Sequence, residues 1–210
     1  MTSPRAILQL RIELLDIEPL IWRRIQVPAD YSFWDLHVAI QSAFGWNDSH
    51  LHEFQVPGGR WPERRFGIPT ENLVGERATL PGWQHRVADF LSPQSPRLRY
   101  WYDFGDDWMH EVIFEERGYA APGTRYPRCL AGERAGPPDD CGGAPGYAHL
   151  LQVLSDPDDE EHEEMTAWLA RIRKLRGRFD PEAFDAQAVR FSRPGPRLAR
   201  LLHAIQCSGD

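Results

Sequence analysis

The first quarter of the chain alternates apolar and polar residues in a pattern that predicts two strands, a helix and a third strand. Ile7 to Leu14 and Leu20 to Val27 are two β-like runs on either side of Glu18-Pro19, and they predict a hairpin. A third strand is expected over His50 to Val56. With the helix that lies between the second and third runs, the pattern predicts an N-terminal ββαβ unit.

That helix has a start signal, an apolar stripe and a stop signal. Ser32 is followed three residues later by Asp35, a variant of the capping box in which two side chains satisfy backbone amides of the first turn. Gly45 ends the helix. The apolar stripe repeats at helical spacing and consists of Phe33, Leu36, Ile40, Ala43 and Phe44.

A segment dense in aromatic and acidic residues, Tyr100 to His110, predicts a second hairpin whose second strand runs to about Glu116. Gly105-Asp106 suits a two-residue loop with glycine first, between two β-prone runs. In that register Phe104 lies opposite Asp107, and four side chains share one face of the hairpin: Trp101, Asp103, Trp108 and His110. Asp103 and His110 become diagonal neighbours, roughly 7–8 Å apart between backbones. This spacing suits a histidine–carboxylate pair, half of a metal site, or a surface ion pair.

The remainder of the chain changes from strands to helices. The segment from Tyr126 to Tyr147, rich in Pro, Gly and Cys, predicts a loop ordered by its turn residues. Helices are expected at Tyr147 to Leu154, at Asp158 to Leu175, after Asp180-Pro181, and at Arg197 to Gln206. Strands first and helices last predict the α+β class with an antiparallel or mixed sheet. We expect one domain over residues 1–192 and a short C-terminal helix or tail at 193–210.

Composition and charge narrow the class of protein. The 210 residues are 41% hydrophobic and 26% charged, which fits one globular domain. No run approaches the roughly 20 apolar residues of a membrane span, and the N-terminus does not read as a signal peptide. Lys and Arg total 24 against 31 Asp and Glu, so the net charge of −7 disfavours nucleic-acid binding. Three cysteines fit a reducing compartment. We therefore expect a soluble cytoplasmic protein.

Several short motifs follow one another in an order that resembles a known family. They are Trp22-Arg23-Arg24 with Val27-Pro28, Ser49-His50-Leu51-His52-Glu53-Phe54, Tyr102-Asp103-Phe104-Gly105-Asp106-Asp107-Trp108, Cys129-Leu130-Ala131-Gly132 with Pro137-Pro138-Asp139-Asp140-Cys141-Gly142-Gly143, and Phe179-Asp180-Pro181. Over residues 5–192 the chain resembles the plasmid-pRiA ORF-three-like family, whose members are often labelled TnpR-type passenger proteins of insertion elements. The resemblance implies an α+β domain and an association with mobile elements, and it implies no established activity. Family members often carry a cysteine where this chain has Gly136, so a three-cysteine metal site loses one ligand.

Histidine, aspartate and cysteine side chains form the strongest chemical candidate. His50 and His52 lie two residues apart, so on a strand they face the same side, a spacing that zinc and iron sites use. The metal-ligand candidates are His50, His52, Asp103, His110, Cys129 and Cys141. Mixed ligands of this kind favour zinc, although the short Cys-x₂₋₄-Cys step of zinc signatures is absent. The alternative is structural: the histidines hydrogen-bond carboxylates or cap strands, and the cysteines are buried as small apolar groups.

Two functions of different classes remain. The first is a binding module that recognises a protein or small ligand through the end of the aromatic hairpin and the loop between Cys129 and Tyr147. Its candidate contacts are Trp22, Arg24, Asp103, Asp106, Asp107, Trp108, Asp139 and Asp140. The second is a metal-dependent enzyme, hydrolytic in class, with His50, His52, Asp103 and His110 as ligands and Asp106 or Asp107 as base. The sequence contains no phosphate loop, dinucleotide glycine fingerprint, serine-hydrolase elbow or serine-resolvase pattern.

Overall fold

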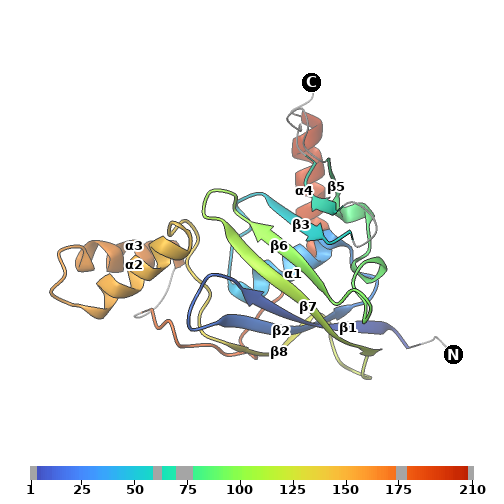
Figure 1. Cartoon of the computed structure of the whole chain (residues 1–210), viewed down its shortest axis with the longest axis horizontal. Coiled ribbons are helices and arrows are strands. Elements are labelled where there is room, and N and C mark those ends of the chain that lie inside the picture. Colours follow the sequence, from blue (N-terminus) through green and yellow to red (C-terminus); the bar gives the residue numbers. More distant parts are fainter. Residues whose placement is uncertain (1–3, 59–62, 70–77, 174–178, 208–210) are drawn as a thin grey trace.

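The computed structural model describes residues 4–58, 63–69, 78–173 and 179–207, and its centre is one eight-stranded sheet (Figure 1). The strand order is β5-β4-β3-β6-β7-β1-β2-β8, and all neighbours are antiparallel except the parallel pair β4 and β5. The strands are β1 (Ala6–Leu14), β2 (Ile21–Pro28), β3 (His52–Val56), β4 (Arg64–Gly67), β5 (Thr79–Pro81), β6 (Arg97–Tyr102), β7 (Trp108–Tyr119) and β8 (Arg128–Glu133). The helices are α1 (Phe33–Phe44), η1 (Gly82–Gln84), η2 (Val87–Asp89), α2 (Gly143–Ser155), α3 (His162–Arg173) and α4 (Pro194–Cys207). The α+β class with a mixed sheet is confirmed.

Helix α1 lies across one face of this sheet and closes the core (Figure 1). Because side chains alternate along a strand, the buried residues of β1 from Leu8 onward lie on one of its faces. On β1, Leu8, Leu10 and Ile12 are at most 1% exposed, and the burial of each such side chain stabilises the fold by about 1.5–3 kcal/mol. From α1, the ring of Phe33 stacks on Phe66 of β4 with 4.4 Å between centroids.

The predicted N-terminal ββαβ unit is confirmed. β1 pairs antiparallel with β2, and α1 and β3 follow. The Ser32 hydroxyl accepts a hydrogen bond from the Asp35 amide, and the Asp35 carboxylate accepts one from the Ser32 amide, which completes the capping box. Gly45 ends the helix in the left-handed conformation, with φ at 82°.

The predicted register of the aromatic hairpin is wrong by one residue. Tyr102 pairs with Trp108 and Tyr100 pairs with His110, so the turn contains five residues, 103–107, in place of two. Asp103 and Asp107 adopt left-handed backbone conformations with φ of 56° and 57°, which aspartate tolerates better than most residues. The buried face therefore carries both tyrosines with Trp108 and His110, while Asp103 leaves the strand.

Two further predictions in the second half of the chain are corrected. The segment from Tyr126 to Tyr147 is not all loop, because β8 lies within it and pairs with β2 at the edge of the sheet, and α2 begins already at Gly143. Gly132 of β8 is required there, since a Cβ would lie 2.7 Å from the Trp22 carbonyl oxygen. The helix predicted after Asp180-Pro181 is absent from the described residues, where isolated turns occupy this stretch.

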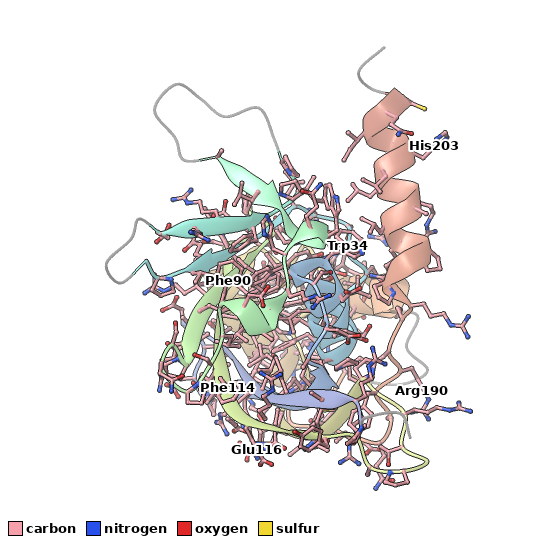
Figure 2. The ribbon with its side chains drawn as sticks, turned by 90° about the vertical axis from the view of Figure 1, so that its right-hand side faces the viewer. Trp34, Phe90, Phe114, Glu116, Arg190 and His203 are labelled. Atoms are coloured by element: carbon pink, nitrogen blue, oxygen red, sulfur yellow. The ribbon has the colours of Figure 1, made fainter. Side chains whose placement is uncertain are left out.

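Helices α2 and α3 form a pair at one end of the sheet, and α4 projects from the body (Figure 1). The start of α4 is fastened to α1 and the loop after it: the Trp34 indole donates to the Pro194 carbonyl at 3.1 Å, and Arg197 contacts Asp48 at 3.1 Å. Figure 2 shows His203 near the far end of α4, away from the sheet. Within the described parts of the chain, no helix combines the length and the apolar character that crossing a membrane requires.

Candidate metal centre

Asp103 is held at the end of the aromatic hairpin with one carboxylate oxygen committed and the other directed at His50. Its Oδ1 accepts hydrogen bonds from the amides of Gly105 at 3.0 Å and Asp106 at 3.3 Å, which fixes the five-residue turn. Its own amide donates to the Leu51 carbonyl at 2.9 Å, and this bond ties the turn to the segment that enters β3. The side chain is only 9% exposed, and its Oδ2 lies 3.5 Å from Nε2 of His50.

The loop before α2 brings a second carboxylate, that of Asp140, to the same histidine. Three contacts fix this loop: the Trp46 indole donates to the Pro137 carbonyl at 2.9 Å, the Asn47 side chain donates to Asp139 at 3.1 Å, and the Gly142 amide donates to Asp106 at 3.2 Å. The prolines and glycines of the loop therefore build a fixed structure packed on the hairpin turn. Asp140 extends from it, 68% exposed, with Oδ1 placed 3.0 Å from Nε2 of His50.

His50, Asp103 and Asp140 form a group in which one ligand atom from each residue lies within 4.8 Å of the other two. The His50 Nε2 atom is buried between two carboxylate oxygens, yet neither contact has the angles of a hydrogen bond. Zinc binds nitrogen and oxygen at about 2.1 Å, so neighbouring ligand atoms lie about 3.0 Å apart at an angle of 90° and about 3.4 Å apart at the tetrahedral angle. The two observed separations, 3.0 and 3.5 Å, match these values.

Further carboxylates surround this group. Asp139 is largely buried, its Oδ1 has no hydrogen-bond partner among the described residues, and burial raises the pKa of its carboxyl above the ordinary value. The Asp106 carboxylate accepts a hydrogen bond from the Gly142 amide, and Asp107 is exposed in the hairpin turn. Several acidic groups concentrated at one place repel one another and create a local field that favours a cation.

Two other predicted ligands, His52 and His110, lie on core-facing positions away from the group. His52 is 2% exposed and its ring stacks on that of His37, with 3.5 Å between centroids. His110 is fully buried among the rings of Phe44 and Trp46. The predicted pairing of Asp103 with His110 is not formed, because the shifted register turns His110 into the core, where Nδ1 donates to backbone carbonyls.

The two cysteines that were predicted as ligands also lie outside the group. Cys129 is on β8 and its thiol donates to the Ala131 carbonyl at 3.5 Å. Cys141 neighbours Asp140, but its thiol is largely buried, and burial raises its pKa to about 12. Among the described residues, its sulfur atom is not one of the ligand atoms that converge in the group of His50, Asp103 and Asp140.

The remaining binding candidates divide between the outer face of the sheet and the core. Trp22 and Arg24 belong to the outer face of β2, where the Arg11 guanidinium lies over the Trp22 ring and Arg24 pairs with Glu115 at 2.7 Å. Trp108 is 2% exposed and packs in the core. These three side chains are explained by the packing of the sheet.

The sequence did not predict a buried network of hydrogen-bonded side chains that lies beside the group. Nε2 of His37 lies 2.5 Å from the Asp48 carboxylate, and its Nδ1 lies 2.8 Å from the Tyr100 hydroxyl. Asp48 also contacts Arg197 of α4. The only signal in the sequence is that His37 falls next to the apolar stripe of α1. The two partners of His37, Asp48 and Tyr100, lie more than fifty residues from each other along the chain, so no spacing rule could have identified the pair.

Comparisons with known proteins agree with this fold. The profile of the family described as Plasmid pRiA4b ORF-3-like protein matches residues 6–188. A relative from Sinorhizobium fredii (strain NBRC 101917 / NGR234), the uncharacterized protein y4hQ, is 35% identical over 166 residues, which make up 78% of this chain and 80% of that protein. The crystal structure of a protein of unknown function from Methanosarcina mazei Go1, MM3350, is 36% identical, with a TM-score of 0.79 over 90% of this chain and 100% of that one. The chain therefore belongs to the plasmid pRiA4b ORF-3-like family.

Proposed function

We propose that this protein is a binding module whose recognition site is built on a divalent cation, zinc in the first place, held by His50, Asp103 and Asp140. Three protein ligands leave at least one coordination position for a ligand or partner. The proposal keeps the binding surface at the hairpin turn and the loop before α2, and it gives that surface a defined chemistry.

The observation that carries the proposal is the Nε2 atom of His50, which lies 3.0 and 3.5 Å from two carboxylate oxygens without the geometry of a hydrogen bond to either. A buried polar atom without a hydrogen bond costs about 1–3 kcal/mol. A cation placed between the three ligand atoms removes that cost and also neutralises the mutual repulsion of Asp103 and Asp140. The backbone supports this arrangement, since Oδ1 of Asp103 is occupied by two amides while Oδ2 faces the histidine.

The hydrolytic alternative has weaker support. A metal-dependent hydrolase needs a base within hydrogen-bond reach of the metal-bound water. The two proposed bases are Asp106, whose carboxylate accepts from the Gly142 amide, and Asp107, which is exposed. Neither belongs to the group of converging ligand atoms, so a binding function fits the geometry better.

The test is zinc binding by protein that has been stripped with a chelator and titrated in a calorimeter. The informative variant is Asp140→Asn, and the matched control is Asp107→Asn. Both aspartates have left-handed backbone conformations, with φ of 59° and 57°, which asparagine also adopts readily, so both substitutions remove one charge without changing the backbone requirement.

We expect one zinc ion per chain in the wild type and in Asp107→Asn. We expect Asp140→Asn to bind zinc at least about tenfold more weakly, because even residues outside a metal's ligand shell change affinity by 10–100-fold. His50→Gln should weaken binding in the same way. The proposal is wrong if the wild type binds no zinc, manganese or iron, or if Asp140→Asn and Asp107→Asn bind equally well.

A further inference from the structure

A cavity of about 430 Å³ lies between α2 and α3 and reaches Asp140. Its walls are mostly apolar, with Leu150 from α2 and Met165 and Trp168 from α3. This volume lies in the range of small-molecule sites, which are typically apolar with a few polar groups that fix the orientation of the ligand. Because Asp140 is both a wall of the cavity and a member of the cation group, the two features are adjacent.

The polar groups of the cavity favour a ligand with one negative charge. Arg171 lies one turn beyond Trp168 on the same side of α3, and none of the carboxylates in the described parts of the chain pairs with it. A guanidinium in this position can accept a carboxylate through two parallel hydrogen bonds. Glu164 lines the same wall seven residues earlier, about 10 Å along the helix, and it disfavours a second acidic group at that end.

The other polar side chains of the cavity are neutral or already paired. His149 contacts Glu161 at 2.7 Å. The Cys141 thiol lines the cavity and packs against the core, so it contributes an apolar surface. Trp168 offers a flat ring face, on which an apolar or aromatic group packs well.

We infer that this cavity is the ligand pocket of the cation site and takes a small monocarboxylic acid with an apolar, ring-sized body. The apolar body packs against Leu150, Met165 and Trp168, and the carboxylate is held by Arg171 and the cation beside Asp140. The inference rests on the proposed cation site for one of its two charge contacts, and on the cavity itself for the rest.

The experiment measures binding of 4-fluorophenylacetate to the full chain by ¹⁹F NMR, with 2-(4-fluorophenyl)ethanol as the matched probe that lacks the carboxylate. Each probe is titrated with zinc present and after removal of metal with a chelator. The variants are Arg171→Gln, Ala167→Phe, which fills the cavity from an exposed position on α3, and the control Arg117→Gln, an exposed arginine on β7.

We expect the acid to bind at least about tenfold more tightly than the alcohol. Arg171→Gln and Ala167→Phe should each weaken binding of the acid by a similar factor, while Arg117→Gln should bind the acid as tightly as the wild type does. If zinc binds but the acid does not, or if Arg171→Gln leaves its affinity unchanged, the pocket assignment is overturned and the cation site stands. If the acid binds equally with and without metal and still requires Arg171, the cavity is an acid-binding pocket that does not use the cation, and the inferred link between the pocket and the cation site is overturned.

Discussion

Acidification should destabilise this protein through His110, which occupies the buried face of the aromatic hairpin. The residue is fully buried, and burial lowers its pKa from the ordinary 6.5 to about 3, although hydrogen bonds to the carbonyls of Tyr100 and Trp108 oppose the shift. Both partners of Nδ1 are carbonyl oxygens, so Nδ1 carries the proton. Nε2 then has only a lone pair, and it finds no donor among the described residues. A second proton at Nε2 would place an unpaired charge in an aromatic core.

The sign and size of the effect follow from proton linkage. The unfolded chain takes up a proton at His110 near pH 6.5, and the folded chain resists it until about pH 3, so the free energy of unfolding falls as the pH falls below 6.5. Integrating the difference in proton binding from pH 8 to pH 5 gives a loss of about 2 kcal/mol from this single residue. Above about pH 8 the unfolded chain no longer binds this proton either, so His110 contributes almost no pH dependence there.

The variant His110→Phe removes the titrating group and keeps an aromatic ring beside Phe44 and Trp46. Urea unfolding of both proteins, followed by circular dichroism at pH 8 and pH 5, gives four free energies of unfolding. Between pH 8 and pH 5, we expect the free energy of unfolding of the wild type to fall by about 2 kcal/mol more than that of the variant. Any constant packing difference cancels in this comparison, and so do the contributions of His37 and His52, which both proteins retain.

The control is His149→Gln, because His149 is exposed and pairs with Glu161 at the surface. The difference in the free energy of unfolding between this variant and the wild type should change little with pH, since exposed ion pairs contribute at most about 1 kcal/mol. If the profiles of wild type and His110→Phe run parallel between pH 8 and pH 5, then His110 titrates normally in the folded protein. The burial of the hairpin face would then be misassigned.

Two other outcomes test the packing near the site. Gly136→Ala should lower the free energy of unfolding by about 1–3 kcal/mol in urea, because its Cβ would lie 2.2 Å from the Phe44 carbonyl oxygen, whereas Gly195→Ala, with open space around it, should not. Thiol titration with a disulfide reagent at pH 8 should label the exposed Cys207 first, and Cys141 should react more than ~100-fold more slowly in the folded protein than after unfolding, because its raised pKa leaves little thiolate. Equal rates for Cys141 in both states would contradict its burial.

The sequence was sufficient to predict elements whose signals are local. The capping box at Ser32 and the glycine stop at Gly45 fix the ends of α1 through bonds within a few residues. The first two strands follow from alternation and from the turn between them. Such signals depend on backbone chemistry that is the same in any protein, which is why β1, β2, α1 and β3 were found.

The hairpin register could not be predicted because the strained positions fell on unexpected residues. The prediction placed Gly105 first in a two-residue loop, whereas the positive φ angles fall on Asp103 and Asp107 and the turn lengthens to five residues. A slip of one residue exchanges the two faces of a strand. This single error removed the expected contact between Asp103 and His110 and turned His110 into the core.

The candidate site required tertiary information for a different reason. Its ligands come from three segments, at residues 50, 103 and 140, and no spacing along the chain encodes their approach. The hydrogen bond from the Gly142 amide to Asp106 joins two of these segments. The sequence analysis assigned this loop and the end of the hairpin to one binding surface, but it identified Asp140 only as a contact residue, because no periodicity within the loop shows which of its side chains approaches His50.

The conformations of Asp103 and Asp140 separate what the backbone needs from what the charge contributes. Both residues have positive φ, and asparagine or glycine satisfies that requirement as well as aspartate does. Backbone geometry therefore does not explain why two negative charges stand beside each other and near the buried carboxyl of Asp139. Their repulsion destabilises the folded loops unless a positive charge compensates it. A divalent cation bound between them supplies that compensation, so zinc should raise the unfolding temperature of the wild type and have a smaller effect on Asp140→Asn.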